Sequence, residues 1–199
     1  YLHKAYHSFG IRYKKNWVAI GIASHFKKLI EHYNPHYVVS AEDTRDNAFL
    51  RRKIYPMYKS NRHGNSDSAM SDEFEIAREY IEASGIRRIY ANGYEADDVI
   101  AALTKKFKGK VKIIIVSGDK DLSQLVCSVS DVELHLNNGR GSGALKHEEL
   151  ITEEDVISKY GVFPTKIPLL FSLIGDKSDC IPGCSGIHDK VAKELVNTY

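Results

Sequence analysis

The segment 112–117, which reads KIIIVS, constrains the fold of this chain more than any other feature. Its unbroken apolar run is typical of a central strand in a parallel sheet, because such a strand is covered by helices on both faces. Weaker strand patterns lie at 37–41, 88–91 and 132–136, and helical patterns lie at 16–33, 71–84, 94–107, 152–160, 165–174 and 187–198. The sequence therefore predicts an α/β domain followed by a helical module.

Composition sets only broad limits. The chain has 199 residues, of which 43% are hydrophobic, and this is enough for one domain or for a domain and part of a second. A net charge of +2 neither indicates nor excludes a nucleic-acid partner, because a local basic patch matters more than the total. Three cysteines without a secretory segment indicate a reducing compartment, and no apolar run is long enough to cross a membrane.

Carboxylates follow the predicted strands at the point where each strand ends. Because ligand sites of open α/β sheets lie beyond the carboxyl ends of the strands, three sets of acids are expected to meet at one edge. A fourth set, in the motif LIGDKSDCIPG, follows a predicted helix instead. In chain order, the acids of the four sets are Asp43, then Glu95, Asp97 and Asp98, then Asp119 and Asp121, and finally Asp176 and Asp179.

Several of these acids, although not Asp43 or Asp119, also have a purely structural explanation. The cluster 95–98 would complement the positive end of a helix, Asp121 would cap a helix, and Asp176 would form a turn. Their joint placement favours a common role, since so many like charges in one place need a counter-ion. Oxygen ligands suit hard cations, so the sequence predicts a site for Mg²⁺ or Mn²⁺ that holds two ions.

The stretch 49–62, FLRRKIYPMYKSNR, lies in a segment, 45–63, that is predicted to be a loop. Tyr55 and Tyr58 alternate with its five cations, which are Arg51, Arg52, Lys53, Lys59 and Arg62. A solvated charged loop is one explanation, but the charge density and aromatic spacing favour a phosphate clamp on which bases stack. The segments 61–71 and 138–149, rich in Gly, Ser and Asn, are predicted to be further loops.

A zinc site is the weaker interpretation of Cys180, Cys184 and His188. Their four-residue spacing resembles that of zinc ligands. Pro182 and Gly183 lie among them, however, so the three side chains do not share a helix face, and a fourth ligand would have to come from elsewhere.

Taken together and in order, these motifs resemble those of the 5′-nuclease family. The family comprises flap endonucleases, phage 5′–3′ exonucleases and the 5′–3′ exonuclease domain of bacterial DNA polymerase I. FLRRKIYPMYKSNR is similar to its basic stretch, and GYEADD, VSGDKDLSQLV and IGDKSDCIPGCSGI are similar to its three acidic motifs. YLHKAYHSF is similar to the segment after its first strand, and the resemblance extends from Tyr1 to about Leu195.

The resemblance implies a PIN-like fold, with a mostly parallel sheet flanked by helices. Residues 1–150 would form the nuclease domain, with a helical arch at about 60–85, and residues 151–199 would form a helix-hairpin-helix-like DNA-binding module. The Asp of the family's first strand would precede Tyr1, and the module would extend past Tyr199, so the chain is expected to be a fragment. His188 and Val191 depart from the Gly and Thr that are common in the family's hairpin.

The resemblance also implies a function. The chain would be a divalent-metal-dependent 5′–3′ exodeoxyribonuclease or flap endonuclease that acts in replication or repair, for instance in RNA primer removal. Its cofactors would be two Mg²⁺ ions, replaceable by Mn²⁺, with K⁺ at the hairpin. Its partners would be DNA with a 5′ flap or 5′ end and RNA–DNA hybrids. It would be a monomer, without a membrane partner, in the cytoplasm of a bacterial or phage-infected cell.

Carried over to this sequence, the resemblance assigns roles to single residues. The eight acids listed above would be metal ligands. Lys59 and Arg62 would contact the scissile phosphate, and Tyr58 would stack near the 5′ end. The remaining DNA contacts would come from Lys4, Arg51, Gly183, Ser185, Gly186 and Lys190.

Three other classes remain alternatives on the sequence alone. A haloacid-dehalogenase-like phosphatase would explain Asp119, Asp121 and a later acid pair, but not the acids at 95–98 or the basic stretch. A non-catalytic DNA-junction binder would use the same surface without cleavage. An RNA-cutting PIN-type nuclease would share the carboxylate edge, but it gives no reason for the hairpin.

Overall fold

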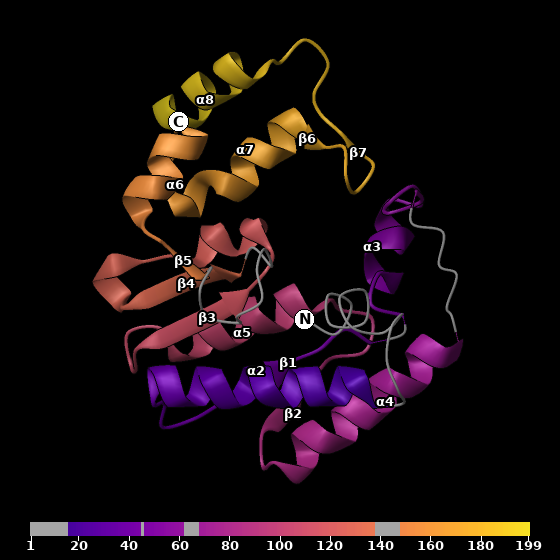
Figure 1. Ribbon diagram of the computed structural model, residues 1–199. Coiled ribbons are helices and arrows are strands. Elements are labelled where there is room, and N and C mark those ends of the chain that lie inside the picture. The colour runs from indigo at the N-terminus through magenta and orange to yellow at the C-terminus, as the bar shows by residue number, and fades with distance from the viewer. Residues whose placement is uncertain (1–15, 45, 62–67, 138–147) are drawn as a thin grey trace.

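The computed structural model describes residues 16–44, 46–61, 68–137 and 148–199 of the chain (Figure 1). Each strand and helix pattern of the sequence corresponds to an element there. The strands are β1 (Val39–Ala41), β2 (Arg87–Ile89), β3 (Ile113–Ser117) and β4 (Val132–Asn137). The helices are α2 (Trp17–Tyr33), α4 (Ser68–Ala83), α5 (Ala96–Phe107), α6 (Glu153–Tyr160), α7 (Ile167–Ile174) and α8 (Asp189–Thr198).

The prediction of a loop over 45–63 is wrong at its centre, where the chain forms helix α3 (Phe49–Ile54). Six residues are too few to show a helical period, and no side chain caps the helix, so no sequence signal marks it. The prediction of a loop over 138–149 is also wrong at its C-terminal end, where strand β5 (Glu148–Ile151) begins. The rest of that loop lies outside the described residues.

The described strands form separate hydrogen-bonded sheets. β1 and β2 pair in parallel, with Val39 opposite Arg87, and β3 and β4 pair in parallel, with Ile113 opposite Val132. β5 is antiparallel to β4. The ten residues between β4 and β5 are too few for the crossover that a parallel pair requires. A two-residue pair, β6 (Gly175–Asp176) and β7 (Ile181–Pro182), closes the turn after α7.

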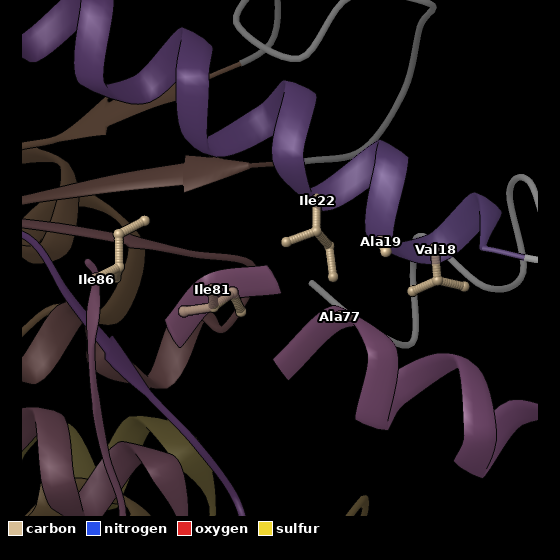
Figure 2. Close-up of a cluster of buried hydrophobic side chains, with 6 residues drawn as sticks. All are labelled: Val18, Ala19, Ile22, Ala77, Ile81 and Ile86. Carbon is tan, nitrogen blue, oxygen red and sulfur yellow. The ribbon is translucent and has the colours of Figure 1, made fainter. Parts of the chain in front are cut away.

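Three buried clusters hold the elements together. Figure 2 shows the first, in which Val18, Ala19 and Ile22 of α2 face Ala77 and Ile81 of α4. The second joins β3 and β4 to a 3-10 helix, η2 (Lys120–Leu125), and the third joins α6, α7 and α8. Figure 1 shows the strands β3–β5 between the pair α2–α4 and the C-terminal helices.

The helical module predicted from residue 152 onward thus has a core of its own, formed by Val156, Val162, Ile167, Leu170, Ala192 and Val196. Helix α4 covers most of the segment 60–85, and its apolar face packs on α2. An arch role for that segment stays a prediction. Within the described residues, no helix combines the length and hydropathy needed to span a bilayer.

His25, on the buried face of α2, makes stability depend on pH. Burial lowers the pKa of this imidazole to about 4. In the unfolded chain this imidazole is protonated below about pH 6.5, whereas in the folded chain it stays neutral down to about pH 4. Lowering the pH between these two values therefore reduces the free energy of unfolding. Between pH 7.5 and 4.5 we expect wild type to lose about 2 kcal/mol more stability than His25→Gln in urea unfolding. Equal losses in the two proteins would contradict this account.

Candidate metal centre

The acids at the ends of β1 and β3 are fixed by backbone hydrogen bonds. Asp43 Oδ1 accepts a hydrogen bond of 2.8 Å from the N–H of Ala96, and this bond ties the end of β1 to the start of α5. Asp119 Oδ1 accepts one of 2.9 Å from the N–H of Asp121 and caps η2. Both acids sit just after the end of a strand, as the sequence predicts.

Glu95 is a buried carboxylate held by the basic stretch. The residue is 7% exposed. Tyr58 donates its phenolic O–H to Glu95 Oε2 at 2.8 Å, and the ammonium of Lys59 is hydrogen-bonded to Oε1. The Arg51 Nη1 atom lies 3.5 Å from Oε2. A buried carboxylate is stable when it is paired in this way, so these contacts explain why a charge can lie inside the protein here.

Asp98 and Arg51 form a bidentate ion pair. The Arg51 nitrogens donate to the two Asp98 oxygens at 2.6 and 2.7 Å, and Asp98 Oδ2 also accepts from the N–H of Glu95 at 3.0 Å. The hydrogen bond from Arg51 is the largest cause that lowers the pKa of Asp98. Arg51 and Asp98 are therefore engaged with each other, and neither is proposed below as a DNA or metal contact.

Lys59 connects the basic stretch to the turn after α7. Its Nζ atom lies 3.7 Å from Asp179 Oδ2, and its backbone N–H donates to the Asp179 carbonyl at 3.0 Å. Asn61 Nδ2 donates to the Ser178 carbonyl at 3.2 Å. Lys59 adopts a left-handed φ of 53°, which non-glycine residues rarely do. Its ammonium therefore lies between Glu95 and Asp179, in the middle of the predicted carboxylate set.

Two of the acids show that negative charge is gathered here. Burial is the largest cause that raises the pKa of Asp97 to about 7, and the charges of Asp119, Asp43 and Glu95 contribute to the same shift. An acid that holds its proton near neutral pH lies in a site with too little positive charge.

Asp121 lies in a second, overlapping group of charges. Burial and the charge of Asp119 raise its pKa, Lys120 opposes this shift, and Asp176 and Asp179 add smaller effects in the same direction as Asp119. Asp119 thus belongs to both groups. The acids after β1, at the N-terminus of α5, after β3 and after α7 thus influence one another's pKa. The sequence predicts such proximity for the first three sets only, because the fourth follows a helix.

The donor set fits a hard divalent cation. Its donor groups are carboxylate oxygens, and two of the acids have raised pKa values, which a dication would reverse. Among the described residues, however, no three His, Cys, Asp or Glu side chains lie close enough to coordinate one ion together. Mg²⁺ tolerates this, because it keeps several waters and needs only one or two carboxylates.

The same finding removes support for zinc at Cys180, Cys184 and His188, since these residues form no trio of ligands either. Cys184 instead lies with its Sγ atom 3.9 Å from the Ser172 carbonyl oxygen.

Tyr58 is placed differently from the expectation that it stacks near a 5′ end. Its side chain is 5% exposed, and its hydroxyl is used by Glu95. The Lys59 Nζ atom lies 5.0 Å from the centre of its ring. In this arrangement the ring has no free face for a base, so Tyr58 acts as a support for Glu95 and Lys59. Lys4 and Arg62 lie outside the described residues.

The hairpin at 183–186 combines one structural glycine with one open turn. A Cβ atom on Gly183 would lie 2.5 Å from the Ile174 carbonyl oxygen, so only glycine fits against the end of α7. Gly186 has a φ of 79° and open space beside it. Ser185 and Lys190 are exposed. A DNA-contact role stays a prediction for all four, and only Gly183 has a separate structural reason.

Sequence patterns do not point to Lys120 and Tyr160, which line a pocket beside Asp119. The position of Lys120 between two of the acids is a signal that could have drawn attention to it. Tyr160 lies 41 residues after Asp119 in the sequence, and only the fold brings them to one pocket.

Comparison with known proteins gives one consistent answer. The family model "5′-3′ exonuclease, N-terminal resolvase-like domain" matches residues 1–161. The 5′-3′ exonuclease of Aquifex aeolicus (strain VF5) is 38% identical over 172 residues, which are 86% of this chain and 55% of that protein. DNA polymerase I of Caldicellulosiruptor bescii is 36% identical over 180 residues, which are 90% of this chain and 20% of the polymerase. The chain therefore spans about half of one relative and a fifth of the other.

A solved structure of T5 5′-exonuclease with bound divalent metal ions (zinc) is similar over the whole chain. The TM-score is 0.76, covering 100% of this chain and 72% of the exonuclease, at 20% sequence identity. At this identity the likeness concerns the fold, and it confirms the α/β nuclease-like architecture expected from the sequence.

Proposed function

The chain belongs to the 5′–3′ exonuclease family, and from this premise we propose that it hydrolyses DNA phosphodiester bonds near 5′ ends with the help of divalent metal ions. The observation that carries the proposal is that acids from four separate parts of the chain shift one another's pKa, with the Lys59 ammonium between two of them, Glu95 and Asp179. Family membership also removes the reason to consider a haloacid-dehalogenase-like phosphatase.

We propose Asp43, Asp97, Asp119, Asp121, Asp176 and Asp179 as the residues that hold the ions, directly or through water. Glu95 stays a candidate, although Tyr58 and Lys59 are hydrogen-bonded to its oxygens. Mg²⁺ is the proposed natural ion and Mn²⁺ a substitute, since both prefer oxygen ligands. A bound divalent ion would supply an activated water and offset negative charge on the phosphate.

The chain's own residues would bind and position the DNA. The Lys59 ammonium lies among the acids, where it can turn toward a phosphate oxygen and offset its charge. Tyr58 holds Glu95 in place beneath it. Ser185, Gly186 and Lys190 of the helical module would hold the duplex through its backbone, without reading bases, and K⁺ is the ion proposed there.

The finer assignment follows from the same premise. The proposed substrates are DNA with a 5′ flap or free 5′ end and RNA–DNA hybrids such as primers, which places the protein in replication or repair. We propose that it acts as a monomer in the cytoplasm of a bacterial or phage-infected cell. A non-catalytic junction binder is the alternative that the same surface permits, and cleavage distinguishes the two.

The test is cleavage of a 5′-flap DNA that carries a label at its 5′ end, using the full-length protein. We expect cleavage in Mg²⁺ and in Mn²⁺, and none in EDTA, where the flap should still bind. Tight binding without cleavage in either ion would replace the proposal with the junction binder. A flap with an RNA 5′ segment, assayed in parallel, tests the proposed role in primer removal.

A further inference from the structure

The segment 105–112, which reads KKFKGKVK, carries five lysines and no acid. It comprises the last residues of α5 and the connection to β3, and all eight residues are exposed. Two of the lysines, Lys105 and Lys106, lie in the last turn of α5, where a cation complements the negative end of a helix. The other three lie beyond the helix, so the helix end does not explain the whole run.

The connection between α5 and β3 is a hydrogen-bonded turn. The N–H of Lys108 donates to the Thr104 carbonyl at 2.7 Å, and the N–H of Lys110 donates to the Phe107 carbonyl at 2.9 Å. Gly109 has a φ of 73°, a left-handed conformation that glycine adopts without strain. The turn therefore holds several ammonium groups near one another, and like charges that are held together repel.

A described acid neutralises the last lysine of the run and no other. Lys112 Nζ donates to Glu133 Oε1 at 2.6 Å. Among the described residues, no ion pair joins the other four lysines to an acid. Phe107 lies between these four and is 40% exposed, with Lys106 Nζ 5.5 Å from its ring centre. We call this surface the lysine turn, and it consists of Lys105, Lys106, Phe107, Lys108 and Lys110.

The lysine turn lies at the end of α5 that is farther from the candidate metal centre. The first residue of the helix, Ala96, is hydrogen-bonded to Asp43. The helix has 12 residues, so its two ends are about 18 Å apart along its axis. The lysines therefore cannot contact a phosphate that is held among the acids, and any ligand of theirs binds at a separate place.

A single strand of nucleic acid matches this surface in two ways. Its phosphates complement the four lysines, and an exposed base can stack on the ring of Phe107, which is how proteins hold single strands without reading their sequence. An acidic protein segment would match the charge, but it has no base to place on the ring.

We propose that the lysine turn is a second nucleic-acid-binding site, which holds single-stranded DNA or RNA by its phosphates and stacks one base on Phe107. The site goes beyond the proposed function, because it takes no part in cleavage and needs no metal ion. A strand bound there would be held at two points of the protein, the metal centre and the far end of α5.

The test is binding of a labelled oligothymidylate in EDTA, followed by fluorescence anisotropy over a range of salt concentrations with the full-length protein. The fourfold variant carries Lys105→Gln, Lys106→Gln, Lys108→Gln and Lys110→Gln. Its plot of log affinity against log salt should be less steep than that of wild type by about 3, because each phosphate contact on a single strand contributes about 0.7. Its thermal midpoint should equal or exceed that of wild type, since the lost charges repel one another.

Phe107→Leu separates stacking from charge. It keeps an apolar side chain at the end of α5 and removes the aromatic ring, so the affinity should fall about tenfold while the salt dependence stays the same. The matched control combines Lys112→Gln with Glu133→Gln. It removes one charge of each sign beside the lysine turn, so its affinity and salt dependence should equal those of wild type.

An unchanged salt dependence in the fourfold variant would overturn the site. An unchanged affinity in Phe107→Leu, or competition by polyglutamate as strong as that by oligothymidylate of equal charge, would overturn the choice of nucleic acid in favour of an acidic protein segment. Because binding is measured in EDTA, a wild-type protein that cleaves no flap would overturn the proposed function and leave the binding site in place.

Discussion

The Asp119→Ala variant is expected to lose Mg²⁺-dependent flap cleavage by on the order of a thousandfold, because a metal site supplies several kcal/mol of transition-state stabilisation. Asp119 lies where the two groups of acids overlap, so its loss weakens both. Binding of the flap in EDTA should remain, since DNA is held by cations and backbone elsewhere. The measurement is the single-turnover cleavage rate at saturating protein.

Glu31→Ala is the control for this variant. It removes an exposed carboxylate from α2, 63% exposed and paired only with Lys27 of the same helix in the described contacts. Its cleavage rate should match wild type. Undiminished cleavage by Asp119→Ala would refute the assignment of the metal centre.

The second large effect is expected for Lys59→Met, which keeps the apolar stem over Tyr58 and removes the charge. The single-turnover rate should fall about a hundredfold, as for loss of one group that stabilises developing charge, while flap affinity changes little. Stability should also fall by about 3 kcal/mol, since Glu95, 7% exposed, loses the nearer of its two cations. Stopped-flow cleavage, a binding titration and urea unfolding measure the three quantities.

Lys59→Arg keeps the charge and should recover much of the rate and most of the stability. If Lys59→Met lowered flap affinity and left the single-turnover rate unchanged, Lys59 would be a binding residue without a part in the chemistry.

Strands and acids followed from local pattern, because each depends on neighbours in the sequence. KIIIVS is apolar enough to be recognised as a strand, and an acid that follows a parallel strand is expected at the carboxyl edge. Its predicted central position is wrong among the described strands, because β3 lies at the edge of the sheet β3-β4-β5 and only Ile115 is fully buried. Helix α3 was not predicted, because six residues without a cap are too short to show a helical periodicity of apolar residues. Strand β5 was not predicted, because it forms through its pairing with β4, a tertiary contact that the local sequence does not show.

The partners of individual charges could not be predicted in the same way. The sequence suggests Arg51 as a DNA contact and Asp98 as a metal ligand. In the structure the two side chains, 47 positions apart in the sequence, form an ion pair with each other. The sequence suggests Tyr58 as a stacking platform, but in the structure the side chain is buried and its hydroxyl donates to Glu95. Composition and spacing place charges at a site, but side-chain packing decides which of them neutralise one another and which stay free for a ligand.

The most direct test of the metal centre is anomalous diffraction from crystals of the protein soaked in Mn²⁺. The account predicts Mn²⁺ peaks within coordination distance of Asp119, beside Asp97 on one side and Asp121 and Asp176 on the other. Peaks elsewhere on the surface, or an empty carboxylate edge at a Mn²⁺ concentration that supports cleavage, would contradict it.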